Sequence, residues 1–316
     1  MIKHIDVMKK ITFRILPVLF LFITTLVQSQ PETPKTPVDN PDNALLWEIS
    51  GKKLAKPSYL YGTIHLIPKD DYVLSDQAKE AFKKAKRATF EIDLEKTMDI
   101  STLMPMMMKM YMNNDTTLRD LLTQDEYTDV KAHFDKIGLP LGFLERIKPM
   151  FLSMLASEDV AASMGKGNSK ESTTTSYEFE LLAIAQEQKK EIAGLETAAY
   201  QMSMFDSIPY KAQAKMLIDA INSGDDAGND EFARMVEMYK NQDIQGMQSM
   251  MGDSSDGLGK YEDLLLVRRN RNWIPVMETM MREKVTFFAV GAGHLGGKQG
   301  VVNLLREQGY TLTPLR

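Results

Sequence analysis

Two four-residue segments with the same pattern each end in a histidine, GTIH at 62–65 and GAGH at 291–294. Neutral imidazole nitrogens bind Zn²⁺, Mn²⁺ and Co²⁺, and two of them with one carboxylate would leave a position open for water. The ion lowers the pKa of that water towards neutrality, so such a site hydrolyses amides or esters without a serine or cysteine nucleophile. The alternative for either His65 or His294 is a hydrogen-bonded structural side chain.

A candidate carboxylate lies in the segment ATFEIDL at 88–94, where apolar residues alternate with Glu91 and Asp93. This alternation predicts a strand with both carboxylates on one side. One carboxylate would then bind a metal, and the other would hold a histidine in position or act as a general base. We expect Glu91 to be the metal-binding group. The alternative is an ordinary solvated strand face.

Both histidines follow apolar runs of strand length that are rich in β-branched and aromatic residues. SYLY at 58–61 precedes the first motif, and VTFFAV at 285–290 precedes the second. In open α/β sheets, ligands bind beyond the carboxyl ends of the strands, where a glycine lets the backbone turn or approach a ligand closely. We therefore expect the two strands to bring both imidazoles into one cleft.

The order of predicted elements indicates an α/β (α+β-like) fold. Strands are predicted at 45–50, 59–64, 88–94, 191–195 and 310–314, besides the strand before the second motif. Most of residues 98–221 has helical periodicity, and 224–230 is predicted to be a flexible acidic turn. Longer helices are predicted at 145–164 and 261–284. This arrangement predicts a central mixed sheet from N- and C-terminal strands, with a large helical insertion over it.

The N-terminus has the pattern of an export signal. Lys3, Lys9, Lys10 and Arg14 precede an apolar stretch at 15–27, with small residues placed for cleavage before Gln30. At about 13 residues this stretch is shorter than the ~20 of a membrane span. We expect a signal peptide at 1–29, a disordered linker at 30–43 and one folded domain at 44–316. The mature protein would be periplasmic or secreted, with no stable membrane span.

Composition limits the classes of site and partner. The chain has no cysteine and a formal net charge of −5, so disulfides are excluded and nucleic acid is not an expected partner. Twelve of its 23 methionines cluster around 104–112, 247–251 and 277–281. We expect these clusters to form a pliable apolar lid or a peptide-binding groove, with plain core packing as the alternative and soft ligands for Cu(I) as a less favoured one. The sequence does not specify an oligomeric state.

With these motifs in place, the chain resembles the TraB/GumN (TraB/PrgY/GumN) family, which includes the Tiki proteins, described as metal-dependent proteases that cleave Wnt ligands. The resemblance covers residues 44–316. It rests on the order and spacing of several segments: LLWEISG, YLYGTIHL, FEIDL, EIAGLETAAYQMSMFDSIPY, the pair Arg269-Asn270 followed by Trp273, and FFAVGAGHLGGKQGVVNLLREQGY.

The resemblance implies a metal site of His65, Glu91 and His294, and a functional role for Arg269. A guanidinium could neutralise a tetrahedral oxyanion or clamp a substrate carboxylate. Without the resemblance, the basic residues around Arg269 are typical of a solvated helix face. The chain departs from the family where many members have Gly-x-Asp, because it has Ser-Tyr-Glu ending in Glu178, which puts the role of an acidic residue there in doubt.

Together these observations predict an exported metal-dependent hydrolase that acts on a peptide or protein substrate. Glu91 and Arg269 would be its catalytic residues, and its divalent ion would be Mn²⁺, Co²⁺ or Zn²⁺. Cleavage of a non-peptide ester would differ only in the substrate pocket. An alternative of another class is a noncatalytic exported protein that sequesters a peptide or a metal-bearing ligand such as haem.

Overall fold

A computed structural model describes residues 42–97, 99–156, 173–222, 224–252 and 258–316. The predicted signal peptide at 1–29 and all but the last two residues of the predicted linker at 30–43 lie outside this part of the chain. No helix in the described ranges is both long and apolar enough to cross a membrane.

The centre of the fold is a six-stranded mixed sheet in the order β6-β4-β7-β2-β1-β8. Strands β6, β4, β7 and β2 run parallel to one another, whereas β1 pairs antiparallel with both β2 and β8. The strand bounds are β1 (Leu46–Gly51), β2 (Ser58–Thr63), β4 (Arg87–Ile92), β6 (Glu191–Glu196), β7 (Thr286–Gly291) and β8 (Tyr310–Leu315). The expected mixed sheet from N- and C-terminal strands is confirmed. The carboxyl ends of its four parallel strands lie along one edge.

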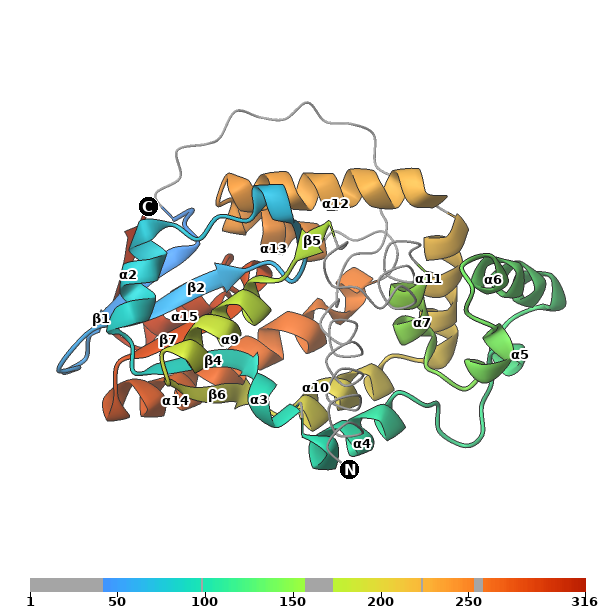
Figure 1. Ribbon diagram of the computed structural model, residues 1–316, viewed down its shortest axis with the longest axis horizontal. Helices are drawn as coiled ribbons and strands as arrows, with labels where there is room; N and C mark the ends of the chain where they lie inside the picture. Colours follow the sequence, from blue (N-terminus) through green and yellow to red (C-terminus); the bar gives the residue numbers. More distant parts are fainter. Residues whose placement is uncertain (1–41, 98, 157–172, 223, 253–257) are drawn as a thin grey trace.

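Helices cover both faces of this sheet (Figure 1). On one face, Phe82 of α2 packs 5.0 Å from Phe287 of β7, and Tyr177 of α9 packs 6.0 Å from Tyr61 of β2, measured between ring centroids. On the other face, Met280 of α14 contacts side chains of β4. The bounds of these sheet-covering helices are α2 (Asp76–Lys84), α9 (Tyr177–Glu187), α14 (Arg268–Glu283) and α15 (Val301–Glu307). Burial on both faces explains why β2 and β4 are buried along their whole length.

The alternation of side chains along β4 decides which way Glu91 points. The Arg87 guanidinium donates to the carbonyl of Met280 at 3.5 Å, and the Thr89 hydroxyl contacts the Met280 sulfur at 3.7 Å. Side chains two positions apart share a face of a strand. Glu91 therefore points to the face that α14 covers, and Arg269 lies on that helix.

The remaining helices form the predicted insertion. Figure 1 shows α12 as one long helix along the top of the molecule, between the sheet and the part that contains α5, α6, α7 and α11. The bounds are α3 (Leu94–Thr97), α4 (Ile100–Lys109), α5 (Leu118–Leu121), α6 (Gln124–Lys136), α7 (Pro149–Leu155), α10 (Ala198–Met204), α11 (Tyr210–Asn222), α12 (Gly224–Lys240) and α13 (Ile244–Gly252). A two-residue antiparallel pair, β3 (Ile67–Pro68) with β5 (Thr174–Thr175), lies beside the main sheet.

Three of the predicted elements differ from the structure. Residues 224–230 belong to α12 and are not a turn, because a composition rich in Gly and Asp is only a weak signal against a helix. Of the helix predicted at 145–164, the described residues form a helix only in α7, which begins at Pro149 because proline fits the first helical turn. The helix predicted at 261–284 begins with 3₁₀ and π segments before α14.

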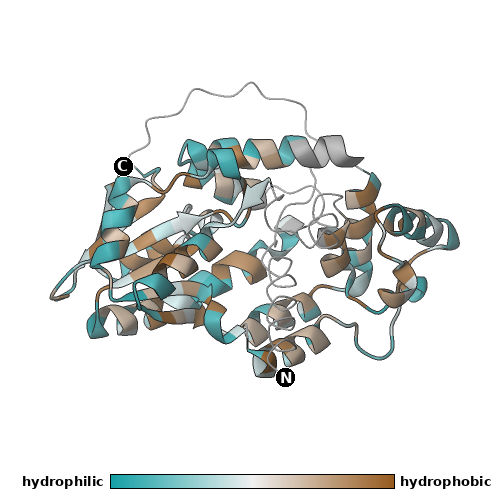
Figure 2. Ribbon diagram, viewed as in Figure 1, coloured by the Kyte–Doolittle hydropathy of each residue, from teal (hydrophilic) through white to brown (hydrophobic). Residues whose placement is uncertain are grey.

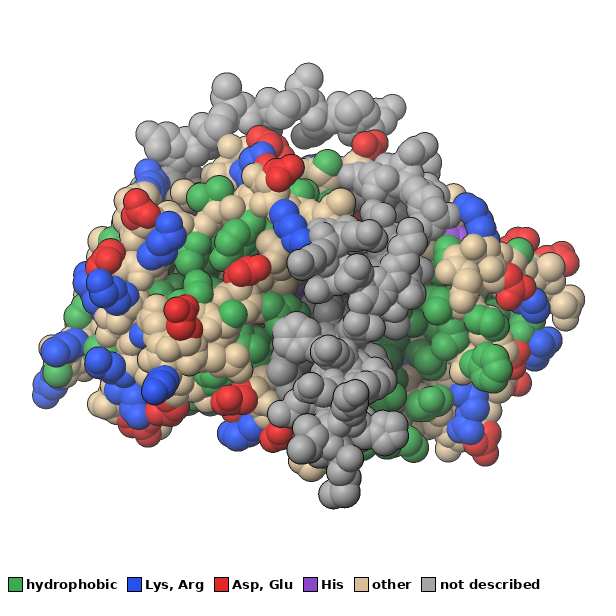
Figure 3. All heavy atoms as spheres, viewed as in Figure 1, with side chains coloured by type: hydrophobic (Ala, Val, Ile, Leu, Met, Phe, Trp, Pro, Cys, Tyr) green, Lys and Arg blue, Asp and Glu red, His purple; other side chains and the backbone are tan. Residues whose placement is uncertain are grey.

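The outer surface of the molecule carries hydrophilic helix faces and charges of both signs (Figure 2, Figure 3). In Figure 2, α2 and α6 are mostly hydrophilic, as expected for helices that expose one side to solvent. On the face drawn in Figure 3, Lys and Arg side chains alternate with Asp and Glu side chains, so this face carries charge of both signs.

Candidate metal-binding site

Parallel pairing of β2 with β7 brings the two histidine motifs side by side. Gly62 pairs with Val290, and Thr63 pairs with Gly291. A Cβ atom added to Gly62 would lie 3.0 Å from the Leu295 side chain and 3.1 Å from the Cβ of Ala292. The first glycine of one motif thus makes room for the loop of the other, so the expectation that both histidines follow strand ends at one edge is confirmed.

Gly291 has a similar role towards the side chains of the site. A Cβ atom on it would lie 3.3 Å from Oε1 of Glu91, 3.7 Å from Cδ2 of His294 and 3.8 Å from Nε2 of His65. Its own N–H donates to Oε1 of Glu91 at 2.9 Å. The three residues of the predicted metal site therefore converge on one glycine at the end of β7.

His65 is held through its Nδ1 atom, which lies 2.8 Å from Oε1 of Glu178. The carboxylate also accepts from Thr63 at 2.6 Å and from Ser176 at 2.8 Å. Burial of His65 favours the neutral ring, but the charge of Glu178 outweighs this effect and raises the His65 pKa. Glu178 therefore fixes the ring orientation and leaves Nε2 on the side of Gly291.

The short pair β3–β5 explains how Glu178 reaches His65. Strand β3 begins two residues after His65, and β5 ends one residue before Ser176, which starts helix α9. Pairing of Ile67 with Thr175 therefore places the first turn of α9 against the end of β2. This contact joins the helical insertion to the histidine motif.

His294 is buried and contacts a partner at each ring nitrogen. Its Nδ1 lies 2.6 Å from Oδ1 of Asn270, and its Nε2 lies 3.1 Å from Nη1 of Arg269. The Asn270 amide nitrogen donates to the carbonyl of Gln299 at 2.8 Å, which fixes the amide orientation and makes Oδ1 an acceptor. Nδ1 of His294 therefore carries the proton, and Nε2 presents a lone pair.

Burial and the positive charge of Arg269 lower the pKa of His294 to about 3. The ring also packs against Trp273, with 4.5 Å between ring centroids. His294 is thus a neutral imidazole across the physiological pH range, which is the form that binds a metal ion.

Glu91 is a buried carboxylate with several donors around it. It accepts hydrogen bonds from the Gly291 N–H, from Gln201 at 3.1 Å and from Arg269. Nε2 of His294 lies 3.7 Å from its Oε1. Burial favours the neutral acid, but the Arg269 charge and these contacts keep the pKa of Glu91 well below its ordinary range. Glu91 is therefore ionised, as a carboxylate ligand must be.

Arg269 connects this carboxylate to a second one, Glu196 at the end of β6. Its guanidinium donates to Glu196 through Nε at 2.9 Å and lies 2.7 Å from it through Nη2, while Nη1 donates to the carbonyl of Leu265 at 3.1 Å. A π-helical segment (Asp263–Val267) comes directly before α14, and such segments are frequent at functional sites. The guanidinium is thus buried among two carboxylates, a carbonyl and an imidazole.

A model of the TraB/PrgY/gumN family matches residues 45–314. The chain belongs to this family. Curated relatives that this TraB/PrgY/gumN chain matches include Metalloprotease TIKI2 of Danio rerio, 23% identical over 87% of this chain and 61% of the relative. Metalloprotease TIKI1 of Homo sapiens is 24% identical over 85% of this chain and 61% of the relative.

The TraB/PrgY/gumN chain also matches the Metalloprotease TIKI homolog of Amphimedon queenslandica, with 22% identity over 86% of this chain and 62% of the relative. It spans about three fifths of the length of these curated relatives. No solved structure matches it.

Two imidazoles and a carboxylate are suitable ligands for a divalent cation, although His65, Glu91 and His294 do not surround a binding position in this arrangement. In the described part of this TraB/PrgY/gumN chain, no group of three His, Asp or Glu side chains is arranged closely enough to hold a metal ion, and Arg269 contacts atoms of both His294 and Glu91. However, both imidazoles are oriented through Nδ1 by another side chain, as is usual for metal-bound histidine.

Charge also favours a cation at this site. The cluster contains three carboxylates, Glu91, Glu178 and Glu196, whose side chains are 6%, 4% and 6% exposed, against one guanidinium. Even when His65 carries a proton, as its raised pKa favours, three carboxylates face one guanidinium and one imidazolium, so negative charge is in excess in a buried place. Buried charges in proteins are paired or coordinate metals, so a divalent ion would balance this cluster.

The structure brings together His65, Glu91, His294 and Arg269, but it places Asp93 elsewhere. Strand β4 ends at Ile92, and Asp93 accepts from the Lys96 N–H at 3.0 Å and forms an ion pair with its side chain at 2.9 Å. The interpretation of Asp93 as the second carboxylate beside a histidine is therefore wrong. Glu178 holds that position next to His65.

Sequence reasoning missed three residues that line the cluster and left the role of a fourth in doubt. Glu196 and Gln201 belong to a segment that carried the family resemblance, and Asn270 belongs to the Arg-Asn pair, but spacing gave no sign that they contact Glu91, Arg269 or His294. Glu178 was considered and doubted. These residues are Glu178, Glu196, Gln201 and Asn270.

The methionine clusters are divided between core and surface. Met106, Met112, Met277 and Met281 are buried, as the core-packing interpretation expects. Met104 and Met108 are exposed by 51% and 66%, and with Ile100 they lie on one side of α4. The exposed side of α4 is compatible with the peptide-groove interpretation, which stays a prediction.

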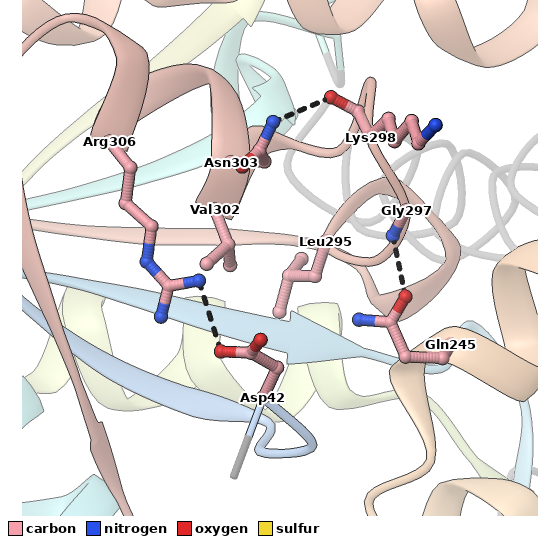
Figure 4. Close-up of a pocket in the computed structure, with 8 residues that line it drawn as sticks. All are labelled: Asp42, Gln245, Leu295, Gly297, Lys298, Val302, Asn303 and Arg306. Atoms are coloured by element: carbon pink, nitrogen blue, oxygen red, sulfur yellow. Dashed lines mark hydrogen bonds and ion pairs between the residues drawn. The ribbon is translucent and has the colours of Figure 1, made fainter. Parts of the chain in front are cut away.

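A cavity of about 300 Å³ lies behind the loop that follows His294. Leu295 and Val302 line it, and Arg306 forms an ion pair with Asp42 at 3.0 Å across its edge (Figure 4). Gly297 donates to Gln245 at 2.8 Å in the same view. The residues that line this cavity include neither imidazole nor Glu91, so it is separate from the predicted metal site.

Proposed function

We propose that this protein is an exported metal-dependent hydrolase that cleaves peptide bonds, with the metal bound by His65, Glu91 and His294. The observation that carries the proposal is the orientation of the two imidazoles. Each is held through Nδ1 by a neighbouring side chain, and each has its Nε2 near Glu91 or Gly291. The names of the curated relatives support the same reaction class.

The residues of the chain have distinct roles in this proposal. His65, His294 and Glu91 would hold the ion, and Glu178 and Asn270 orient the two rings. A bound Mn²⁺, Co²⁺ or Zn²⁺ would supply a Lewis acid and a water molecule of lowered pKa. Gln201 donates to Glu91 and limits the rotation of its carboxylate.

Arg269 is suited to stabilise negative charge on the substrate. A guanidinium stays charged at any pH of interest and presents several donors in one plane, so it can face a carbonyl oxygen that becomes an oxyanion or a terminal carboxylate. Exclusion of water from this buried cluster strengthens such contacts. Arg269 therefore combines with the metal ligands in one reaction centre.

We further propose that residues 1–29 are removed on export and that 44–316 form the folded domain after a linker at 30–43. The basic N-terminal residues followed by the apolar stretch at 15–27 support this. The mature protein would be periplasmic or secreted. Mass spectrometry of the protein recovered outside the cytoplasm should show a new N-terminus close to Gln30, and recovery of the intact N-terminus would contradict the proposal.

The metal content of the purified protein tests the reaction centre. The protein would be equilibrated with Mn²⁺, Co²⁺ and Zn²⁺ and compared with a His65→Ala, His294→Ala double variant by elemental mass spectrometry. We expect close to one ion per chain in the parent and its loss in the variant, together with metal-dependent cleavage in a peptide library. Metal absent from both proteins would exclude the mechanism, whereas bound metal or haem without turnover would favour a sequestering protein.

A further inference from the structure

The two carboxylates that contact Arg269 belong to neighbouring parallel strands, with Glu91 on β4 and Glu196 at the end of β6. Glu196 is anchored at both oxygens. Its Oε1 receives the guanidinium, and its Oε2 accepts the indole N–H of Trp273 at 3.0 Å. Trp273 is fully buried on α14, one helical turn after Arg269, and its ring lies 4.9 Å from the guanidinium carbon. Glu196 and Trp273 therefore hold the Arg269 guanidinium in a fixed position.

The other contacts of Arg269 are made to atoms that the proposed metal also requires. Nη1 lies 3.1 Å from Nε2 of His294, and Nη2 contacts Oε2 of Glu91. An imidazole Nε2 has one lone pair, so it cannot accept from a guanidinium and bind a cation at the same time. Metal binding and the Arg269–His294 contact exclude each other.

We propose that Glu196 is a positioning residue that holds Arg269 beside the site while a divalent ion takes the His294 lone pair. The inference rests on the proposed function, because it concerns the same metal site. When Nη1 leaves His294, the guanidinium keeps its Nε bond to Glu196 and its contact with the ring of Trp273, neither of which involves Nη1. Arg269 then stays beside the site and no longer competes with the ion for the His294 lone pair.

Without the charge of Glu196, the guanidinium would keep one carboxylate partner, Glu91. Arg269 would then bind Glu91 and His294 more firmly, and it would compete with the ion for both. Glu196 is not among the residues proposed to bind metal, so its influence on metal affinity should act through Arg269. This dependence separates a positioning role from the general attraction of a negative charge for a cation.

Isothermal titration of Mn²⁺ and Zn²⁺ into four purified proteins tests this dependence. They are the parent, Glu196→Gln, Arg269→Gln and the double variant. We expect Glu196→Gln to weaken metal binding by about 10-fold or more, in the range of residues that orient metal ligands. Arg269→Gln should bind metal at least as tightly as the parent although it loses turnover. In the Arg269→Gln background, the second change should alter affinity by less than about 3-fold.

An equal loss of affinity in both backgrounds would overturn the inference and leave the metal site intact, because charge attraction alone would explain it. A parent that binds no metal would overturn the proposed function as well, so the two failures are distinguishable. If Glu196→Gln does not fold, as judged by circular dichroism, Glu196→Asp replaces it in the same cycle. The shorter carboxylate keeps the charge but loses reach, and its effect should likewise vanish when Arg269 is absent.

Discussion

Oε1 of Glu178 lies 2.8 Å from Nδ1 of His65, although 113 positions separate the two residues. The contact joins the first turn of α9 to the loop after β2, and it fixes a ring that keeps 21% of its side-chain surface exposed. Through this single carboxylate, the helical insertion controls the orientation of a residue on the central sheet.

Replacement of Glu178 should therefore weaken metal binding without removing a proposed ligand. We expect Glu178→Ala to lower metal affinity by about 10- to 100-fold, because His65 loses the partner that fixes its tautomer and orientation. Glu180→Ala is the matched control, since Glu180 lies on the same helix and bonds to Thr175 instead. Isothermal titration would measure both, and equal losses in the two variants would contradict the assigned role.

His294 should make the folded state less stable as the pH falls. Its pKa of about 3 in the folded protein lies below its ordinary value of 6.5, so the unfolded chain binds the proton first. Between pH 6.5 and 4.5, this residue should remove about 2 kcal/mol from the free energy of unfolding, at up to about 1.4 kcal/mol per pH unit. His65 acts in the opposite direction, because its pKa is raised.

A comparison of variants isolates this contribution. In urea unfolding with chelator present, His294→Asn should show a shallower fall in stability over that pH interval than the parent. His133→Asn, on α6 and outside the cluster, should follow the parent curve. If the parent and His294→Asn lost the same free energy of unfolding, His294 would not be buried in its neutral form.

Gly291 should tolerate no side chain. A Cβ atom there would lie 3.3 Å from Oε1 of Glu91, tighter than an ordinary contact, and at ordinary contact distance from both histidines. We expect Gly291→Ala to destabilise the protein by about 1–3 kcal/mol, as overpacking does, and to lower metal affinity. Gly142→Ala provides the control, because a Cβ atom at Gly142 meets nothing within 4 Å. Thermal unfolding of the two variants should differ clearly, and similar curves would show that Glu91 moves aside at little cost.

The ion pair between the buried Lys148 and Asp206 should contribute to the free energy of unfolding. Its side chain is 1% exposed, and Nζ lies 2.6 Å from Asp206 and donates to the carbonyl of Lys109 at 2.6 Å. Asp206→Ala would leave a buried ammonium with one neutral acceptor, so we expect a loss of about 2–3 kcal/mol, less than for a fully enclosed pair because Asp206 is 34% exposed. Asp219→Ala breaks the exposed Lys215–Asp219 pair and should cost under about 0.5 kcal/mol by the same urea titration.

The sequence predicted the parts of the site whose signal is local. Strand-length apolar runs before the two GxxH motifs placed His65 and His294 at strand ends, and the alternation in ATFEIDL placed Glu91, together with Asp93, on one face of a strand. These inferences need only the period of a strand and the turn that a glycine permits. The resemblance to a family added Arg269, which charge patterning alone assigns to a solvated surface.

The contacts that hold these residues could not be predicted in the same way. Glu178 reaches His65 only because β3 pairs with β5, and a two-residue pairing leaves no periodic signal. Asp93 lies outside the site because the strand ends two residues earlier than its alternation suggests, and Asp93 bonds to the backbone of Lys96. Element boundaries depend on such competing local bonds, which spacing does not reveal.

Strand β7 lies between β4 and β2 although it comes almost last in the chain, and Thr286 donates to Ser58 across 228 positions. Until Val285 and the residues after it are available, β2 and β4 would have no partner between them, and the edges of both would be open to pairing with other chains. Such high contact order predicts slow folding that begins only when the whole polypeptide is present. A chain truncated before β7 should accumulate as aggregate rather than as a smaller folded domain.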